Sequence, residues 1–97
     1  MLEIVIRRLA LRDLDGIATY TKSRWGNTQS RSYLTSLKRD IQSLGEYPLR
    51  YPLHPGFAGE VRKMLSGHHI VIYCIQDDRI EIVRVLHERM DVDGKLT

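Results

Sequence analysis

The side chains in this sequence that are best suited to catalysis are His87, Glu88, Arg89 and Asp91, which lie almost consecutively near its end. An imidazole can transfer protons near neutral pH, a carboxylate can act as a general base, and a guanidinium can stabilise charge on a phosphate. The set is therefore compatible with acid–base cleavage of RNA, which needs a base, an acid and cations in one place. Alternation along an extended segment, however, directs Glu88 away from His87 and Arg89.

Each of these residues also has a structural explanation. His87 closes a predicted core strand, a position where a histidine more often makes a structural hydrogen bond than a proton transfer. Arg89 and Asp91 are two residues apart and can form an exposed ion pair, worth less than about 1 kcal/mol. Residue type and spacing leave both interpretations open.

The remaining histidines do not predict a metal site. His68 and His69 are adjacent, so a strand directs them to opposite faces, and His54 is distant in sequence. No Cys or His pair has the spacing of zinc ligands. We therefore expect neither a metal nor another cofactor.

Residues 87–91 follow two apolar runs, residues 70–75 and 80–86, which are rich in β-branched residues. A short polar segment with Asp77 and Asp78 separates them, so the pattern predicts a β-hairpin. The first run is apolar on both faces and needs cover on both sides, whereas the second carries Glu81 and Arg84.

The first half of the chain predicts one strand and two helices. Alternation over residues 2–7 is typical of a strand, and a helical period starts at Leu11. Gly26 is placed to end this helix, and Asn27 or Thr28 to cap a second helix that reaches Leu44. Five cations and no carboxylate lie between positions 22 and 39. We expect an αα-hairpin that is basic on its outer side.

A loop with all three prolines then leads to a strand over residues 60–65 and a turn at Ser66 and Gly67. Trp25 and Tyr33 fall near the apolar stripes of the helices and are predicted to be core residues. We expect Tyr51, in the loop, to be exposed, and residues 92–97 to be a loose end or a short addition to the sheet edge.

The composition indicates one folded domain spanning residues 1–97, with 42% hydrophobic and 28% charged residues and a net charge of +3. A single cysteine, Cys74, excludes an internal disulfide and fits a reducing compartment. The first residues predict neither a signal peptide nor a membrane span. We expect a soluble, cytoplasmic protein with no membrane partner.

A set of residues spread over nearly the whole chain matches the pattern of a known family: Asp13, Leu14, Ile17 and Tyr20; Trp25 and Gly26; Tyr33 and Leu37; Pro48; Val61 and Arg62; Ser66, Gly67 and His68; Ile72 and Tyr73; Val85, Leu86 and His87; and Arg89, Met90 and Asp91. Together with the order of elements, these residues resemble the ParE-type toxins of the RelE/ParE superfamily, the toxin half of bacterial toxin–antitoxin pairs. The entry to the first helix departs from the family, because residues 8–10 replace its common Ser-Pro start.

The resemblance implies an α+β fold of β-α-α-β-β-β order, with an N-terminal strand and an αα-hairpin packed on a mainly antiparallel sheet. It implies a type II toxin of the plasmid-stabilisation class and a ParD-like antitoxin, whose disordered C-terminal segment folds on the toxin. Operator DNA is then reached only through the antitoxin. The implied target of the ParE branch is DNA gyrase, whereas the RelE branch cuts mRNA on the ribosome.

RelE-like nucleases usually carry arginines on the sheet and a C-terminal tyrosine. Here Leu65 precedes the Ser66 turn, and no tyrosine follows Tyr73. We therefore predict a toxin that binds and inhibits without catalytic residues. Two alternatives remain: a RelE-type mRNA endonuclease, with His87 or Glu88 catalytic, and a non-toxic module that only binds its antitoxin.

Two sets of contact residues follow from this interpretation. Met64 and Met90 can offer adaptable contacts to a partner, although filling gaps in a small core is an equal alternative. The predicted target-facing residues are Arg62, Arg84, His87, Arg89, Met90 and Asp91. The predicted antitoxin-facing residues are Arg24, Arg31, Lys38, Tyr51 and Met64.

Overall fold

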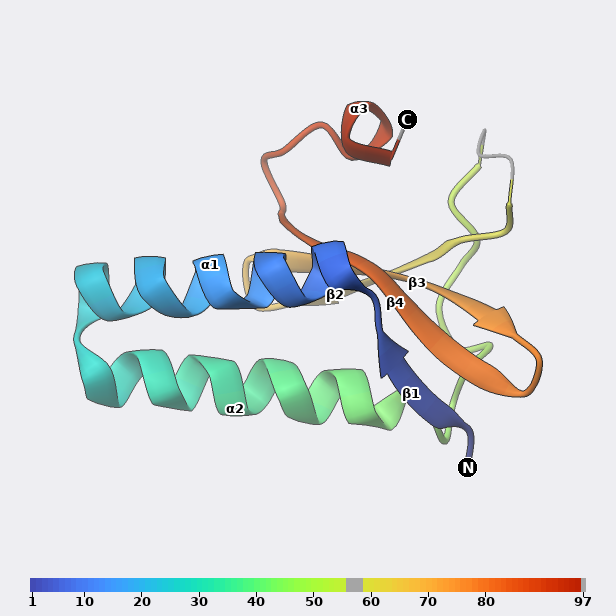
Figure 1. Ribbon diagram of the computed structural model, residues 1–97, viewed down its shortest axis with the longest axis horizontal. Coiled ribbons are helices and arrows are strands. Elements are labelled where there is room, and N and C mark those ends of the chain that lie inside the picture. The colour runs from blue at the N-terminus through green and yellow to red at the C-terminus, as the bar shows by residue number, and fades with distance from the viewer. Residues whose placement is uncertain (56–58, 97) are drawn as a thin grey trace.

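A computed structural model describes residues 1–55 and 59–96 and contains one four-stranded sheet with a helical hairpin (Figure 1). The strand order is β1-β4-β3-β2, with β1 parallel to β4 and the other two pairings antiparallel. The predicted element order and mainly antiparallel sheet are confirmed, with one additional short helix at the end. The elements are β1 (Glu3–Ile6), α1 (Arg8–Trp25), α2 (Asn27–Ser43), β2 (Arg62–Ser66), β3 (His69–Gln76), β4 (Arg79–His87) and α3 (Val92–Leu96).

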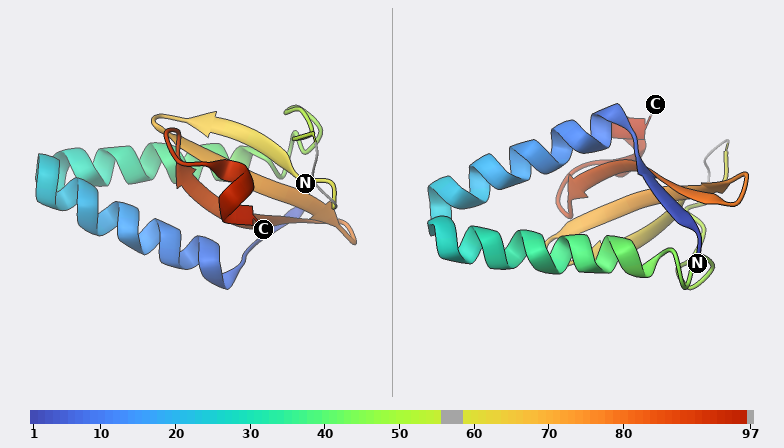
Figure 2. Two further views of the ribbon diagram at one scale, coloured as in Figure 1. Left: turned by 90° about the horizontal axis from the view of Figure 1, so that it is seen from above. Right: turned by 60° about the horizontal axis from the view of Figure 1, so that its bottom comes forward.

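The helices α1 and α2 lie side by side and antiparallel, and they cover one face of the sheet (Figures 1 and 2). Their apolar positions, among them Ile17, Leu37 and Ile41, pack against Tyr73 and Ile82 in the main core. A buried hydrogen bond of 2.6 Å joins the hydroxyls of Thr21 in α1 and Ser30 in α2. The apolar side chains, spaced three and four residues apart along each helix, therefore pack against the sheet as the sequence predicted.

The connection between the two helices is a single glycine. Gly26 ends α1 as predicted because its φ of +88° lies outside the helical range, while its amide still donates to the carbonyl of Lys22. The prediction that Asn27 or Thr28 caps α2 is wrong. Gly26 itself precedes the first helical residue, and no side chain caps that end. α1 also begins at Arg8, three residues before the predicted start.

The β3–β4 hairpin confirms the central prediction. Asp77 and Asp78 both have positive φ, as a two-residue hairpin turn of type I′ requires. A bulge between Ile72 and Tyr73 shifts the register, so Tyr73 pairs with Ile82 while Ile72 pairs with Arg84. Ile82 and Val85 can then both belong to the helix-facing core.

The second face of the sheet is also covered, as the double-sided apolar pattern of β3 required. Ile72, Cys74 and Leu86 form a smaller cluster there, against which Val92 and Leu96 of α3 pack. The prediction of a loose end after position 91 is therefore wrong for residues 92–96. Burial raises the pKa of the Cys74 thiol, which keeps it in the unreactive protonated form.

The loop before β2 is ordered over its described part. The Tyr73 hydroxyl donates to the carbonyl of Pro48 at 2.9 Å, and Arg62 donates to the carbonyl of Tyr51 at 2.6 Å. β2 runs from Arg62 to Ser66, shifted from the predicted 60–65.

Trp25 is exposed at the end of α1, so its assignment to the core is wrong, although its ring contacts that of Tyr33. None of the helices in the described ranges combines the length and apolar character needed to cross a membrane.

Candidate functional site

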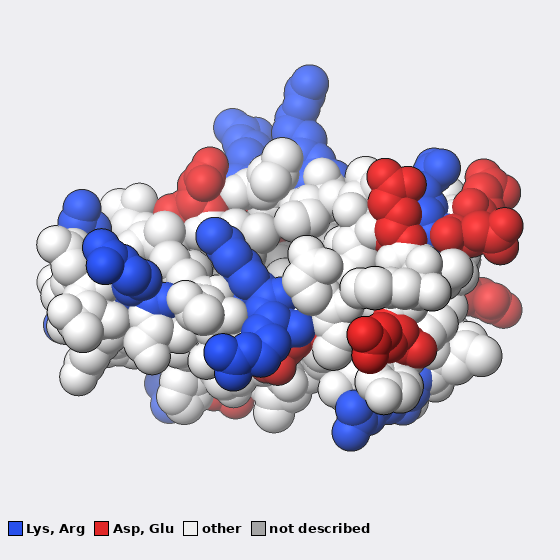
Figure 3. Space-filling view, turned by 90° about the horizontal axis from the view of Figure 1, so that it is seen from below, with Lys and Arg blue, Asp and Glu red and all other residues white. Residues whose placement is uncertain are grey.

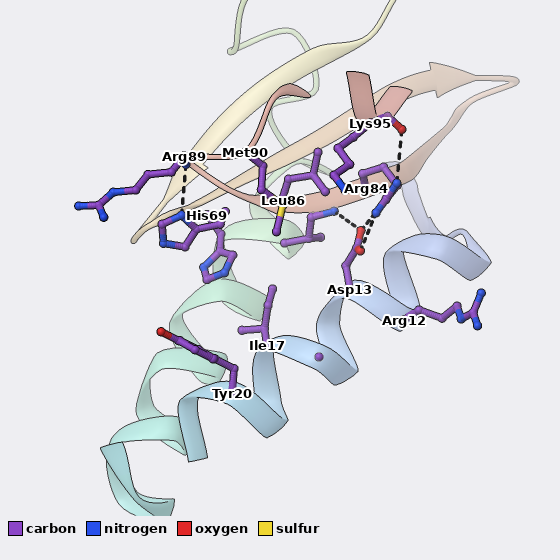
Figure 4. A pocket seen from close by; sticks show the side chains of 13 residues that line it. Arg12, Asp13, Ile17, Tyr20, His69, Arg84, Leu86, Arg89, Met90 and Lys95 are labelled. Atoms are coloured by element: carbon purple, nitrogen blue, oxygen red, sulfur yellow. Dashed lines mark hydrogen bonds and ion pairs between the residues drawn. The ribbon is translucent and has the colours of Figure 1, made fainter. Parts of the chain in front are cut away.

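A groove of about 590 Å³ lies between α1 and the end of β4 with the residues that follow it (Figure 4). We call it the α1–β4 groove. It brings together cations, imidazoles and apolar side chains from α1, β3, β4 and α3. Its described lining contains the cations Arg12, Arg84, Arg89 and Lys95, the histidines His69 and His87, the apolar side chains of Ile17, Tyr20, Val85, Leu86 and Met90, together with Asp13 and Gly16.

The groove exists because β1 ends before β4 does. β1 pairs with β4 only as far as Ile82, and α1 then takes the place of the missing strand. Asp13 of α1 accepts the amide of Val85 at 2.9 Å, which satisfies the free edge of β4. The same carboxylate binds Arg84 at 2.8 and 3.0 Å.

The Asp13–Arg84 pair is therefore part of the framework of the groove. The side chains are only 15% and 17% exposed, and Arg84 also donates to the carbonyl of Lys95 at 3.4 Å. Arg84, predicted as a target contact, has its guanidinium occupied by these partners. We reassign it to holding α1 and α3 against β4.

The other cations of the groove differ from Arg84 in this respect. Within the part of the chain that the structure describes, no ion pair joins Arg12, Arg89 or Lys95 to a carboxylate. In Figure 4 Arg12 and Arg89 extend from opposite sides of the groove, and Met90 points toward α1. Met90 and Tyr20 are 47% and 55% exposed. The rim is thus cationic and the wall apolar and accessible.

The segment after β4 is a tight turn, not the extended chain that the sequence predicted. The amide of Met90 donates to the carbonyl of His87 at 2.9 Å, and the amide of Arg89 donates to Nδ1 of His87 at 3.2 Å. Glu88 does point away from this groove, but through the turn, and its carboxylate binds His68 at 2.7 Å. The alternative ion pair between Arg89 and Asp91 does not form.

Three histidines meet behind this turn. The ring of His87 lies 6.4 Å from that of His68, nearly parallel, and 5.4 Å from that of His69, edge to face. The Tyr33 hydroxyl accepts the amide of His68 at 3.0 Å and shares a hydrogen bond of 2.5 Å with Nδ1 of His69. Burial and the neighbouring histidines lower the pKa of His69, and the hydrogen bond to His68 lowers the pKa of Glu88.

This arrangement is suited to binding. Asp13, the carboxylate of the described lining, is held by Arg84 and Val85. Nδ1 of His87 accepts the amide of Arg89, and Nδ1 of His69 is engaged with the Tyr33 hydroxyl. Proton transfer requires a base with a free lone pair directed at the substrate, whereas exposed cations beside apolar side chains favour association with an anionic, partly apolar surface.

The structure places four of the six predicted target-facing residues in one groove: Arg84, His87, Arg89 and Met90. Arg62 lies apart on β2, where it holds the loop carbonyl of Tyr51, and Asp91 follows the turn at the start of α3. Sequence reasoning missed Arg12, Tyr20 and Lys95. Tyr20 belongs to the residues that match the family, which was a signal for it, whereas the placement of Lys95 depends on a helix that was not predicted.

The predicted antitoxin-facing residues separate into three groups. Arg31 and Lys38 line a shallow groove of about 300 Å³ between α1 and α2, which we call the α1–α2 groove. Arg24 lies elsewhere, over the ring of Tyr20 at 5.5 Å. Tyr51 is half-buried against the core, not exposed as predicted, and Met64 is 1% exposed. Met64 therefore fills the core and cannot be a surface contact.

Figure 3 shows the face of the molecule on the α2 side, where positive side chains lie over the helical hairpin and negative ones gather toward the opposite end.

The fourth histidine, His54, binds Asp93 of α3 at 2.5 Å. In residues 1–55 and 59–96 no cluster of His, Cys, Asp and Glu is arranged to hold a metal ion.

Comparison with known proteins agrees with this architecture. Residues 4–92 match the family of the ParE toxin of type II toxin–antitoxin system, parDE. The chain belongs to this family. It is 35% identical over 91 residues to toxin ParE1 of Caulobacter vibrioides, covering 94% of each chain, and 31% identical over 102 residues to toxin ParE of Escherichia coli, covering 99% of this chain and 94% of that one.

The fold also matches a solved structure titled as the chromosomal ParDE system of P. aeruginosa, with a TM-score of 0.78 at 17% identity over 90% of this chain and 96% of that one. The resemblance noted from the sequence is thereby confirmed for the family and the fold. The context of a toxin–antitoxin pair implies a protein antitoxin as partner.

Proposed function

We propose that this ParE-family toxin acts by binding and inhibiting DNA gyrase, with the α1–β4 groove and its turn as the target-facing surface. The observation that carries the proposal is the exposed pair of Arg89 and Met90 beside Arg12 and Lys95, two cations that form no ion pair with a carboxylate of the described chain. Arginine and methionine are enriched at interface cores, and arginine is among the residues that most often dominate binding energy.

The antitoxin partner is placed on the helical hairpin in this proposal. Arg31 and Lys38 line the α1–α2 groove with Leu34 and Ala18, so that charge and apolar surface alternate there. A ParD-like segment with acidic residues would complement this surface and would order on binding. Operator DNA would then be contacted by the antitoxin and not by this chain.

One observation favours the alternative of an mRNA endonuclease. The α1–β4 groove holds His69 and His87 close to Arg89, and imidazoles beside a cation can serve phosphate chemistry. Catalysis would require one of these imidazoles to exchange its present hydrogen bond for a substrate. The third possibility, a module that only holds its antitoxin, predicts neither activity.

The experiment uses the purified chain, freed from antitoxin, in a gyrase supercoiling assay and in a translation-coupled mRNA cleavage assay. We expect inhibited supercoiling or accumulated cleaved DNA, together with intact mRNA, and we expect the cognate antitoxin to reverse the effect. Cut mRNA with normal supercoiling would replace the proposal by the nuclease. Two inactive assays from a folded chain would favour the antitoxin-binding module.

A further inference from the structure

We propose that His87 is a positioning residue of the α1–β4 groove, whose neutral imidazole fixes the turn at residues 88–90 and releases it when protonated. The inference deepens the proposed function, because this turn carries two of the side chains that face the target there. The state of the turn can nevertheless be measured on the free chain.

The turn is anchored twice to His87. The amide of Arg89 donates to Nδ1 of the imidazole at 3.2 Å, and the amide of Met90 donates to the carbonyl of the same residue at 2.9 Å. His87 pairs with His69 at the end of the β3–β4 ladder, so the anchor belongs to the sheet. The side chains of Arg89 and Met90 line the groove directly beyond it (Figure 4).

The hydrogen bond from Arg89 requires a lone pair on Nδ1. A neutral imidazole with its proton on Nε2 has this lone pair, whereas a protonated imidazole donates from both nitrogens. Two donors would then face each other across the present contact. The ring must rotate away or the turn must open, and either change removes the acceptor of the Arg89 amide.

The groups around His87 are themselves titratable. His68, from the connection before β3, stacks on one side, and His69 of β3 meets the ring on the other, with Tyr33 of α2 behind it. Glu88 of the turn, the nearby carboxylate, already binds His68 at 2.7 Å.

Across the groove the charged groups come from α1, β4 and α3. Arg12 and Lys95 are cations without a carboxylate partner in the described chain, and the charges of Asp13 and Arg84 compensate each other. A proton on His87 therefore adds a positive charge to a groove that is already cationic.

The test follows the amides of Arg89 and Met90 by NMR on the labelled full chain between about pH 8 and about pH 5, the range in which histidines ordinarily titrate. In the wild type we expect the Arg89 amide shift to follow protonation of the His87 ring. We also expect its exchange with water, corrected for intrinsic pH dependence, to increase roughly three- to tenfold, as loss of one exposed hydrogen bond implies.

Three variants give the matched controls. In His87→Asn the side-chain oxygen can accept from the amide two residues on, so the Arg89 amide is expected to stay bound and its shift to stay flat with pH. His87→Leu removes the acceptor, so the amide is released at every pH. His68→Gln removes the stacked ring but keeps a side-chain donor within reach of Glu88 and keeps the backbone bond from the Glu88 amide, so it is expected to keep the wild-type titration.

Two results would overturn the proposal. The first is an Arg89 amide that titrates in His87→Asn as it does in the wild type, since another group would then control the turn. The second is a wild-type amide that stays unchanged while the His87 ring takes up its proton. His87→Asn and His68→Gln decide the question even where His87→Leu does not fold.

Binding to immobilised gyrase at about pH 7.5 and about pH 6 relates the turn to the target. We expect wild-type affinity to fall roughly three- to tenfold at the lower pH and the ratio for His87→Asn to stay near one. If no variant binds gyrase at either pH, the proposed target is wrong, while the amide titration still decides the role of His87.

Discussion

Replacing Asp13 by alanine is expected to destabilise the protein strongly, because one carboxylate satisfies two different groups. Val85 would lose the acceptor of its amide, which costs about 1–3 kcal/mol when the group is buried. Arg84 would lose a two-point charged contact, worth about 1.5–3 kcal/mol before screening by solvent. The side chains are 15% and 17% exposed, so water replaces part of this loss, and we expect a total of about 2–4 kcal/mol.

The assay is thermal unfolding of the variant against the wild type. For a chain of 97 residues, about 3 kcal/mol corresponds to roughly 12–24 °C in melting temperature, which is easily resolved. Asp15→Ala is the matched control, because it removes an exposed carboxylate from the same helix and is expected to change stability by less than about 0.5 kcal/mol.

A double-mutant cycle separates the two losses. Arg84→Met removes the charge that Asp13 neutralises, so Asp13→Ala is expected to cost less in that background than in the wild type. The remaining cost then measures the amide of Val85. An Asp13→Ala variant as stable as Asp15→Ala, or a cycle with no coupling, would refute the reasoning that this pair builds the groove.

Three further predictions concern the histidine cluster and the α1–α2 groove. Because the pKa of His69 is lowered in the folded protein, the unfolded chain binds this proton first as pH falls. The contribution of His69 to the free energy of unfolding is therefore complete above about pH 6.5 and declines below it, as urea midpoints at several pH values can show. Gly67→Ala is expected to lower the melting temperature, because its φ is +58° and a Cβ would lie 2.7 Å from the Tyr33 ring. Reversing the charges of Arg31 and Lys38 to Glu is expected to weaken binding of the antitoxin at least tenfold in titration calorimetry.

Each of these has its own control. His69→Gln should flatten the decline in stability at low pH, and an unchanged slope would assign the decline to another group. Gly16→Ala adds a methyl group where nothing lies within 4 Å, so it should be neutral or stabilising. Reversal of Arg8, an exposed cation at the start of α1, should leave antitoxin binding unchanged; equal losses would indicate only a general charge effect.

The sequence predicts the framework well because local signals carry it. Asp77 and Asp78 adopt the positive φ that a two-residue turn needs, and Gly26 ends α1 where the helical period stops. The double-sided apolar pattern of β3 correctly required a second covering layer. What the pattern could not identify was α3 as that cover, since Val92 and Leu96 give too short an apolar repeat to predict a helix of five residues.

The site was less predictable because it depends on contacts between distant residues. Arg84 looked like a free cation until Asp13, 71 residues earlier, was found beside it. In β2 either of two neighbouring apolar residues could face the core, and the structure buries Met64 while leaving Leu65 62% exposed. Arg89 and Met90 were selected because they matched the family motif, and tertiary structure then added Arg12 and Tyr20 across the groove.

The central claim is that the α1–β4 groove is the surface that inhibits the target. The most direct measurement compares gyrase inhibition by the wild type with that of Arg89→Ala and Met90→Ala, with Arg8→Ala as the control for an exposed cation outside the groove. We predict that each groove variant remains folded and loses about tenfold or more in inhibition, while Arg8→Ala stays within about twofold. Equal inhibition by all four proteins would contradict the account.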